Sequence, residues 1–188
     1  MIEWLKKLFG LKEKKVEKAE ICRMVEDKTM LELRTMVDRI EFHEGLRLKP
    51  YRCTRGKLTI GIGRCIDTNP FTTEELIAIG DWKHGITKAM AYMLCQNDIN
   101  RCIKELKKEI PFFANLDKER QYALIDLCFN MGIDGLKRFK KMLEALGTGN
   151  YCRASDELLN SKYATQVGTR AKRIAKLIET GRWEQWIG

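Results

Sequence analysis

The chain has 188 residues, 44% of them hydrophobic, and 35 Lys and Arg against 26 Asp and Glu give a formal net charge of +9. This length predicts one moderate domain or two small lobes with a real core, and the hydrophobic content argues against an intrinsically disordered chain. The positive charge favours polyanionic partners, including nucleic acid, anionic lipid and the bacterial wall, without choosing among them.

The first 28 residues are predicted to be a basic extension of the main domain. Between Met1 and Lys18, apolar residues can share one side of a helix: Ile2, Trp4, Leu5, Leu8, Phe9 and Leu11. Such a helix can lie on an anionic membrane surface or pack against protein. Charges interrupt every apolar run, which excludes a transmembrane span, and the segment lacks the features of a secretory signal. We therefore expect synthesis in the cytoplasm.

The next segment predicts a helix followed by a β-hairpin. Apolar residues recur at helical spacing before Gly45, which can close the helix in a left-handed conformation: Leu33, Met36, Val37 and Ile40. Arg55-Gly56 is a turn signal, and an alternating pattern follows it: Leu58, Ile60 and Ile62. A helix C-terminus carrying Glu44 would therefore face a hairpin carrying Cys53 and Thr59.

Glu44 is a candidate general acid. The negative end of the helix dipole and desolvation in a cleft both favour a neutral carboxyl group over a carboxylate. A carboxyl group that keeps its proton near neutral pH is what general-acid catalysis needs.

The remainder of the chain predicts helices. A short helix begins at Thr72-Thr73-Glu74-Glu75 and extends to Ile79, and Thr87 caps a long helix through Glu109 that Pro111 stops. Apolar periodicity and closing glycines predict further helices at 117–131, 136–146, 151–159 and 169–179.

Several segments together carry a specific pattern. Glu44 begins Glu-Gly-Leu-Arg-Leu, Thr59 begins Thr-Ile-Gly-Ile-Gly, and Gly168 begins Gly-Thr-Arg-Ala-Lys-Arg. Eight residues separate Glu44 from Cys53, and five separate Cys53 from Thr59. This combination resembles the T-even-type phage lysozymes, the muramidases of glycoside hydrolase family twenty-four, and the resemblance extends over 31–186.

The resemblance implies an α+β, lysozyme-like fold. It comprises a small N-terminal lobe with a β-hairpin sheet, a long connecting helix and an all-helical C-terminal lobe. The corresponding bounds are 1–28 for the extension, 29–188 for the catalytic domain, about 31–86 for the N-terminal lobe, about 87–109 for the connecting helix and about 111–188 for the C-terminal lobe. The resemblance also implies an ion pair between Arg64 and Asp98.

The resemblance further implies roles for five residues. Glu44 would be the general acid, Asn130 a polar cleft residue, and Arg170 a cation that approaches Glu44 and holds it in place. Cys53 stands where most members have Asp, and Thr59 would bind the attacking water. A thiolate at Cys53 could orient water, stabilise positive charge on the sugar or attack it directly. We favour the water-mediated, inverting reaction.

The cysteine pattern argues against a metal centre. None of the seven cysteines lies in a Cys-x-x-Cys element, so we expect no zinc site, and the chemistry requires no metal or organic cofactor. An odd count without a secretory signal is typical of reduced thiols in a cytosolic protein. Oxidation of Cys53 with Cys22 or Cys65 is a hypothesis for a switch, because some family members use thiol pairing in this way.

Three functions remain open from the sequence. The first is an endolysin-type muramidase that hydrolyses the β-1,4 bond between N-acetylmuramic acid and N-acetylglucosamine, released to the wall during phage lysis. The second is a catalytically silent peptidoglycan-binding protein, since Cys53 replaces Asp. The third is a membrane-active basic protein that uses 1–18. No nucleic-acid-binding motif is present. We expect peptidoglycan as the partner, an anionic membrane surface for 1–18, no nucleic acid and a monomeric protein.

Overall fold

The computed structural model describes residues 35–183. The basic extension at 1–28 and Leu33 lie outside the described residues, so the helix expected at 1–18 stays a prediction. A helix occupies 35–44 and is followed by Gly45, which has a φ of +72°. The Gly45 amide donates to the Glu41 carbonyl at 2.7 Å, so the predicted helix end before the hairpin is confirmed.

A small antiparallel sheet follows the helix. Its strands are β1 (Arg47–Arg52), β2 (Leu58–Gly61) and β3 (Arg64–Cys65), in the order β1-β2-β3. Tyr51 pairs with Thr59, and the turn between β1 and β2 contains Gly56 with a φ of +74°. The predicted hairpin is therefore confirmed. Strand β3 was not predicted, because two residues are too short to show an alternating pattern.

The predicted starts of the next two helices are confirmed. Helix α2 (Thr73–Ile79) has Thr72 as its N-cap, with a reciprocal capping box to Glu75. A short 3₁₀ turn, η1 (Trp82–His84), leads to α3 (Lys88–Glu109), whose N-cap is Thr87. Both caps satisfy amide groups that a helix start otherwise leaves unpaired.

Helices make up the rest of the described chain. After the 3₁₀ turn η2 (Phe113–Asn115) come α4 (Lys118–Leu136), α5 (Lys140–Gly147), α6 (Tyr151–Leu159), α7 (Lys162–Val167) and α8 (Thr169–Thr180).

The predicted helix end at Gly132 is confirmed, because its φ of 74° and ψ of 165° are not helical, so that α4 consists of two helical segments on either side of this residue. One expectation for this part was wrong. The second segment continues to Leu136, so the helix expected from 136 begins only at Lys140. Helix α7 was not predicted, because it contains no buried residue and so has no apolar stripe.

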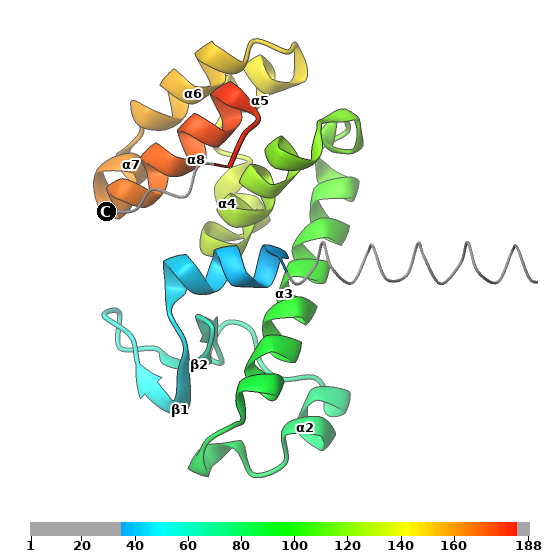
Figure 1. The fold of residues 1–188 in the computed structure, drawn as a ribbon, viewed down its shortest axis with the longest axis vertical. Helices are drawn as coiled ribbons and strands as arrows, with labels where there is room; N and C mark the ends of the chain where they lie inside the picture. The colour runs from blue at the N-terminus through cyan, green and yellow to red at the C-terminus, as the bar shows by residue number, and fades with distance from the viewer. Residues whose placement is uncertain (1–34, 184–188) are drawn as a thin grey trace, which may run out of the picture.

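The elements are arranged around α3, which runs through the length of the molecule (Figure 1). The sheet and α2 lie at one end of α3, and α4 to α8 lie at the other. A smaller core joins the sheet to α2 and α3 and contains Ile60, Ile79, Ile86, Ala91 and Leu94. The helix at 35–44 instead contributes Met36, Val37 and Ile40 to the larger core of the helical end. This is the expected α+β architecture.

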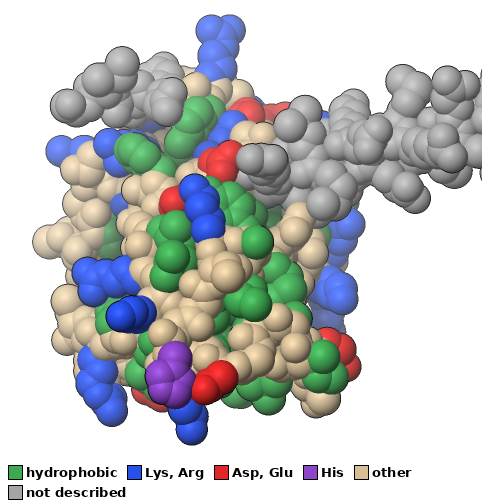
Figure 2. All heavy atoms as spheres, turned by 60° about the horizontal axis from the view of Figure 1, so that its bottom comes forward, with side chains coloured by type: hydrophobic (Ala, Val, Ile, Leu, Met, Phe, Trp, Pro, Cys, Tyr) green, Lys and Arg blue, Asp and Glu red, His purple; other side chains and the backbone are tan. Residues whose placement is uncertain are grey.

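The surface carries the excess of positive charge. On the face at the sheet end of the molecule, Lys and Arg side chains outnumber Asp and Glu (Figure 2). Exposed basic residues in this part of the chain include Arg47, Lys49, Arg52 and Arg55. Within 35–183, no helix combines the length and the apolar character needed to cross a bilayer.

Candidate active site

A cleft of about 890 Å³ lies between the sheet and the middle of the helical part of the chain. Its lining includes Glu44, Cys53, Thr59 and Asn130, so the structure brings together these four residues that the sequence singled out. Arg170 is not part of the lining and lies behind Glu44.

Glu44 is held at the cleft by contacts from two helices. Its side chain is 22% exposed, and its Oε1 lies 2.5 Å from Nη1 of Arg170 on α8. Asn130 on α4 donates from Nδ2 to the same oxygen at 3.4 Å. On another side the carboxyl group packs against Gly63, which has no side chain to displace it. Glu44 therefore occupies one defined position while part of it reaches the cleft.

Cys53 lies in the turn after β1. Its amide donates to the Lys57 carbonyl at 3.0 Å, and its carbonyl accepts from the Gly56 amide at 2.8 Å. The turn also presents the Arg55 amide to the sulfur, and this hydrogen bond is the main reason why the pKa of the Cys53 thiol is lowered. A contribution from the Lys57 amide acts in the same direction. The local backbone therefore favours a thiolate at this position.

Thr59 faces the cleft from β2. The residue is only 4% exposed, and its hydroxyl donates to the Lys57 carbonyl at 3.1 Å. Because the proton is used in this bond, the lone pairs of the hydroxyl oxygen remain available to accept a hydrogen bond from water or substrate.

Arg170 is itself held by a residue that the sequence argument missed. Asp126 on α4 accepts a hydrogen bond from Nε of Arg170 at 2.9 Å, and Nη2 of Arg170 lies at the same distance without hydrogen-bond geometry. His43 lies on the other side, with its Nε2 3.7 Å from Oδ2 of Asp126. A sequence signal existed, because Asp126 lies one helical turn before Asn130 on the same helix and His43 precedes Glu44.

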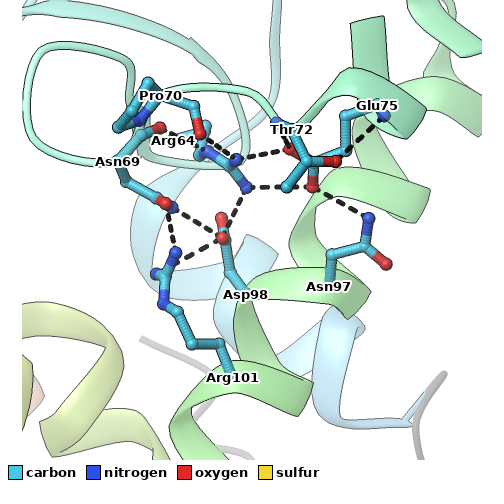
Figure 3. Close-up of polar contacts among 8 residues, drawn as sticks. All are labelled: Arg64, Asn69, Pro70, Thr72, Glu75, Asn97, Asp98 and Arg101. Carbon is cyan, nitrogen blue, oxygen red and sulfur yellow. Dashed lines mark hydrogen bonds and ion pairs between the residues drawn. The ribbon is translucent and has the colours of Figure 1, made fainter. Parts of the chain in front are cut away.

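A buried ionic network supports the strand that follows Gly63 (Figure 3). Arg64 on β3 contacts Asp98 on α3 at 2.5 Å and Glu75 on α2 at 2.7 Å. The expected Arg64–Asp98 pair is thus confirmed, and the side chains of all three residues are 3–4% exposed. Asn97 donates to Glu75, while Asn69 donates to Asp98 (Figure 3). The network fixes the sheet to α2 and α3 beside the cleft.

The other described cysteines are free thiols, and no metal-binding cluster is found among the described residues. Cys95, Cys102 and Cys128 are buried, Cys65 is half-buried and Cys152 is exposed, and all are free thiols. Cys22, a suggested partner of Cys53, lies outside the described residues. In the part of the chain from 35 to 183, no three His, Cys, Asp or Glu side chains are placed to hold a metal ion.

The chemistry available in the cleft is that of acid–base hydrolysis. It combines a carboxyl group that can donate a proton, a thiol with a lowered pKa and a hydroxyl group that can accept a hydrogen bond from water. A pair of groups that protonates a leaving oxygen and assists a nucleophile is what cleavage of a glycosidic bond requires.

Comparisons with known proteins point to one family. The family model for phage lysozyme matches residues 41–180. A probable T4-type lysozyme 2 of Dictyostelium discoideum is 28% identical over 166 residues, covering 81% of this chain and 98% of that protein. The endolysin of Acyrthosiphon pisum secondary endosymbiont phage 1 is 30% identical over 131 residues, covering 70% of this chain and 80% of its own.

A larger phage protein contains a similar region. The pre-baseplate central spike protein Gp5 of Enterobacteria phage T4 is 32% identical over 165 residues, which are 81% of this chain but 29% of that protein. The family match covers most of the described residues, including the cleft and its supporting helices. The chain therefore belongs to the phage lysozyme family.

Proposed function

We propose that the protein is a muramidase that hydrolyses the β-1,4 bond between N-acetylmuramic acid and N-acetylglucosamine in bacterial peptidoglycan. The observation that carries this proposal is the cleft in which the supported carboxyl group of Glu44 meets the Cys53 thiol and the Thr59 hydroxyl. Membership of the phage lysozyme family supports the same reaction class, and relatives named lysozyme and endolysin agree with it.

Glu44 is the general acid in this mechanism. Its carboxyl group protonates the glycosidic oxygen as the bond to the leaving sugar breaks, and positive charge develops on the other sugar ring. Arg170 and Asn130 hold Oε1 of Glu44, which keeps the acid in one orientation toward the substrate.

Thr59 and Cys53 act on the attacking water. The Thr59 oxygen accepts a hydrogen bond from the water, because its own proton is donated to the Lys57 carbonyl. The Cys53 thiolate orients the water and stabilises the sugar cation, in the place where most inverting glycosidases have a second carboxylate that acts as general base. Water attacks the anomeric carbon, its proton leaves to solvent, and the configuration inverts.

Release of reducing ends from purified peptidoglycan tests the proposal. We expect activity in the wild type, loss of at least about a hundredfold in Glu44→Gln, and a clear decrease in Cys53→Ala. Cys152→Ala is the matched control, because Cys152 is an exposed thiol on α6. Binding without any release of reducing ends would favour the silent wall-binding protein. Vesicle leakage that survives Glu44→Gln would favour a membrane-active protein.

The stereochemistry of the product tests the role of water. NMR of the first product should show inversion at the anomeric carbon, because one displacement by water inverts it. A retained configuration would indicate two displacements and make Cys53 a nucleophile that forms a glycosyl-enzyme intermediate.

A further inference from the structure

Glu44, Arg170 and Asp126 form a line that runs from the cleft into the protein. One guanidinium group is shared by two carboxyl groups, with Nη1 of Arg170 at 2.5 Å from Glu44 and Nε at 2.9 Å from Asp126. The exposed fraction of the side chain falls from 22% for Glu44 to 10% for Arg170 and 5% for Asp126. Glu44 alone reaches the cleft, so Asp126 cannot contact the substrate.

The charge balance of these three groups matters for catalysis. Arg170 keeps its proton throughout the working range of pH, so it carries a fixed positive charge. If Glu44 and Asp126 were both ionised beside Arg170, the three side chains would carry a net charge of about −1 in a largely buried environment, which is unfavourable. With one carboxyl group ionised and the other protonated, the cluster is neutral. The group that holds the proton decides whether Glu44 can act as an acid.

Among residues 35–183, Asp126 contacts Arg170 and His43. His43 comes from the helix at 35–44, and burial and the charges of Arg170 and Arg173 lower its pKa to about 4. It is therefore neutral at neutral pH. Tyr163 on α7 is also neutral, because burial raises its pKa to about 12.

Arg173 is the other cation of this region, and its guanidinium lies over the Phe42 ring at 4.7 Å from the ring centroid. Arg170 is thus the cation that Asp126 compensates. Burial raises the pKa of Asp126 to about 6, despite the opposing charge of Arg170, so the carboxylate is present at neutral pH.

We propose that Asp126 is a positioning residue that holds Arg170 against Glu44 and balances its charge, so that Arg170 orients the acid without directing its full positive charge onto Glu44. This inference rests on the proposed role of Glu44 as the general acid. It assigns two tasks to the Arg170–Asp126 pair. Arg170 fixes the orientation of the acid, and Asp126 prevents the same cation from holding the acid in its ionised form.

Asp126→Asn separates the two tasks. Asparagine has the same shape and keeps an oxygen that can accept from Nε of Arg170, but it carries no charge. Arg170 would then act on Glu44 alone and stabilise the carboxylate. An uncompensated charge at such a distance typically moves a carboxyl titration by about 1 to 3 pH units.

The first test is the pH profile of kcat/KM for reducing-end release by the full-length protein. We expect the alkaline limb of Asp126→Asn to move to lower pH by about 1 to 3 units, with much of the activity recovered in acid. Asp126→Glu, which restores the charge, should return the limb toward its wild-type position. Asp156→Asn, an exposed change of the same kind on α6, should leave it in place. A uniform loss across the pH range, or an unchanged profile, would overturn the proposal.

The second test does not need activity. NMR of the Glu44 carboxyl carbon should show a lower titration midpoint in Asp126→Asn and a higher one in Arg170→Gln, where the cation is absent. Circular dichroism would verify that each variant is folded, and Arg170→Gln keeps the test decisive if Asp126→Asn does not fold. An unchanged midpoint in either folded variant would contradict the charge balance. Full activity of Glu44→Gln would instead refute the proposed function, whatever these midpoints show.

Discussion

A β-carbon at Gly63 would stand 3.0 Å from Oε2 of Glu44 and 3.1 Å from its Cγ and Cδ. Gly63 lies between β2 and β3 and has a φ of +68°, so both its backbone conformation and its missing side chain matter. The turn between β2 and β3 therefore leaves room for the carboxyl group of Glu44, the last residue of the helix at 35–44.

Gly63→Ala is expected to lose most of its activity while it stays folded. The added methyl group must push the Glu44 side chain away from its position against Arg170, and since a misplacement of about 1 Å can cost about a hundredfold in rate, we expect this smaller shift to cost about tenfold. The positive φ adds about 1 to 2 kcal/mol to the cost in folding stability. Reducing-end release and urea unfolding measure the two effects separately.

Gly149→Ala is the matched control for this variant. Gly149 has a φ of +74°, but a β-carbon there would meet nothing within 4 Å. It should lose a similar amount of stability and keep its activity. Equal loss of activity in both variants would show that general destabilisation, and not contact with Glu44, explains the result.

The sequence predicted elements whose signals are local. Thr72 and Thr87 begin α2 and α3 because a threonine N-cap acts within one helical turn. Gly132 ends the first segment of α4 through its positive φ, as predicted, whereas the second segment up to Leu136 carried no such local signal.

The site was predictable only as far as its motif extended. Glu44, Cys53 and Thr59 are near one another in the chain, whereas Asp126 meets Arg170 only because α4 packs on α8. No periodicity records such a contact between distant segments. Glu75 shows the same limit, because it was predicted as part of a helix start and it also binds Arg64.

Asp98→Ala should destabilise the protein strongly. The change leaves the buried Arg64 with one carboxylate fewer, and breaking a buried ion pair typically costs about 3 to 5 kcal/mol. Lys176→Ala breaks the Lys176–Glu179 pair at 3.2 Å, whose side chains are about 40% exposed, and should cost less than about 1 kcal/mol. Urea unfolding of both variants provides the comparison. Similar small losses would mean that Glu75 alone satisfies Arg64.

His43 should make stability depend on pH. Its pKa is lowered to about 4 in the folded protein, mainly by burial, whereas the unfolded chain takes up the proton near the ordinary value of 6.5. The contribution of His43 is therefore present above pH 6.5 and is lost as the pH falls toward 4. Asp126 acts in the opposite sense, because its raised pKa of about 6 stabilises the fold in acid and this stability is lost as the pH rises.

Comparison with His43→Gln isolates the histidine. The difference in unfolding free energy between wild type and variant should shrink by up to about 3 kcal/mol between pH 7 and pH 4. His84→Gln on the exposed turn η1 should show a much smaller change, because an exposed ion pair contributes little. Parallel curves for wild type and His43→Gln would show that His43 is not kept neutral by the fold.

Cys53 should be alkylated before the buried thiols. The Arg55 amide lowers the pKa of the Cys53 thiol, whereas burial raises the pKa of Cys95. The pKa of Cys128 is raised by a hydrogen bond that its thiol donates to Cys102 and by burial. Since the thiolate is the reactive form, iodoacetamide should modify Cys53 first and abolish reducing-end release in proportion. Peptide mass spectrometry during the reaction would follow both, with the exposed Cys152 as an internal reference. Full modification of Cys53 with activity retained would exclude the thiolate from orienting the water and stabilising the sugar cation, because an alkylated sulfur cannot ionise.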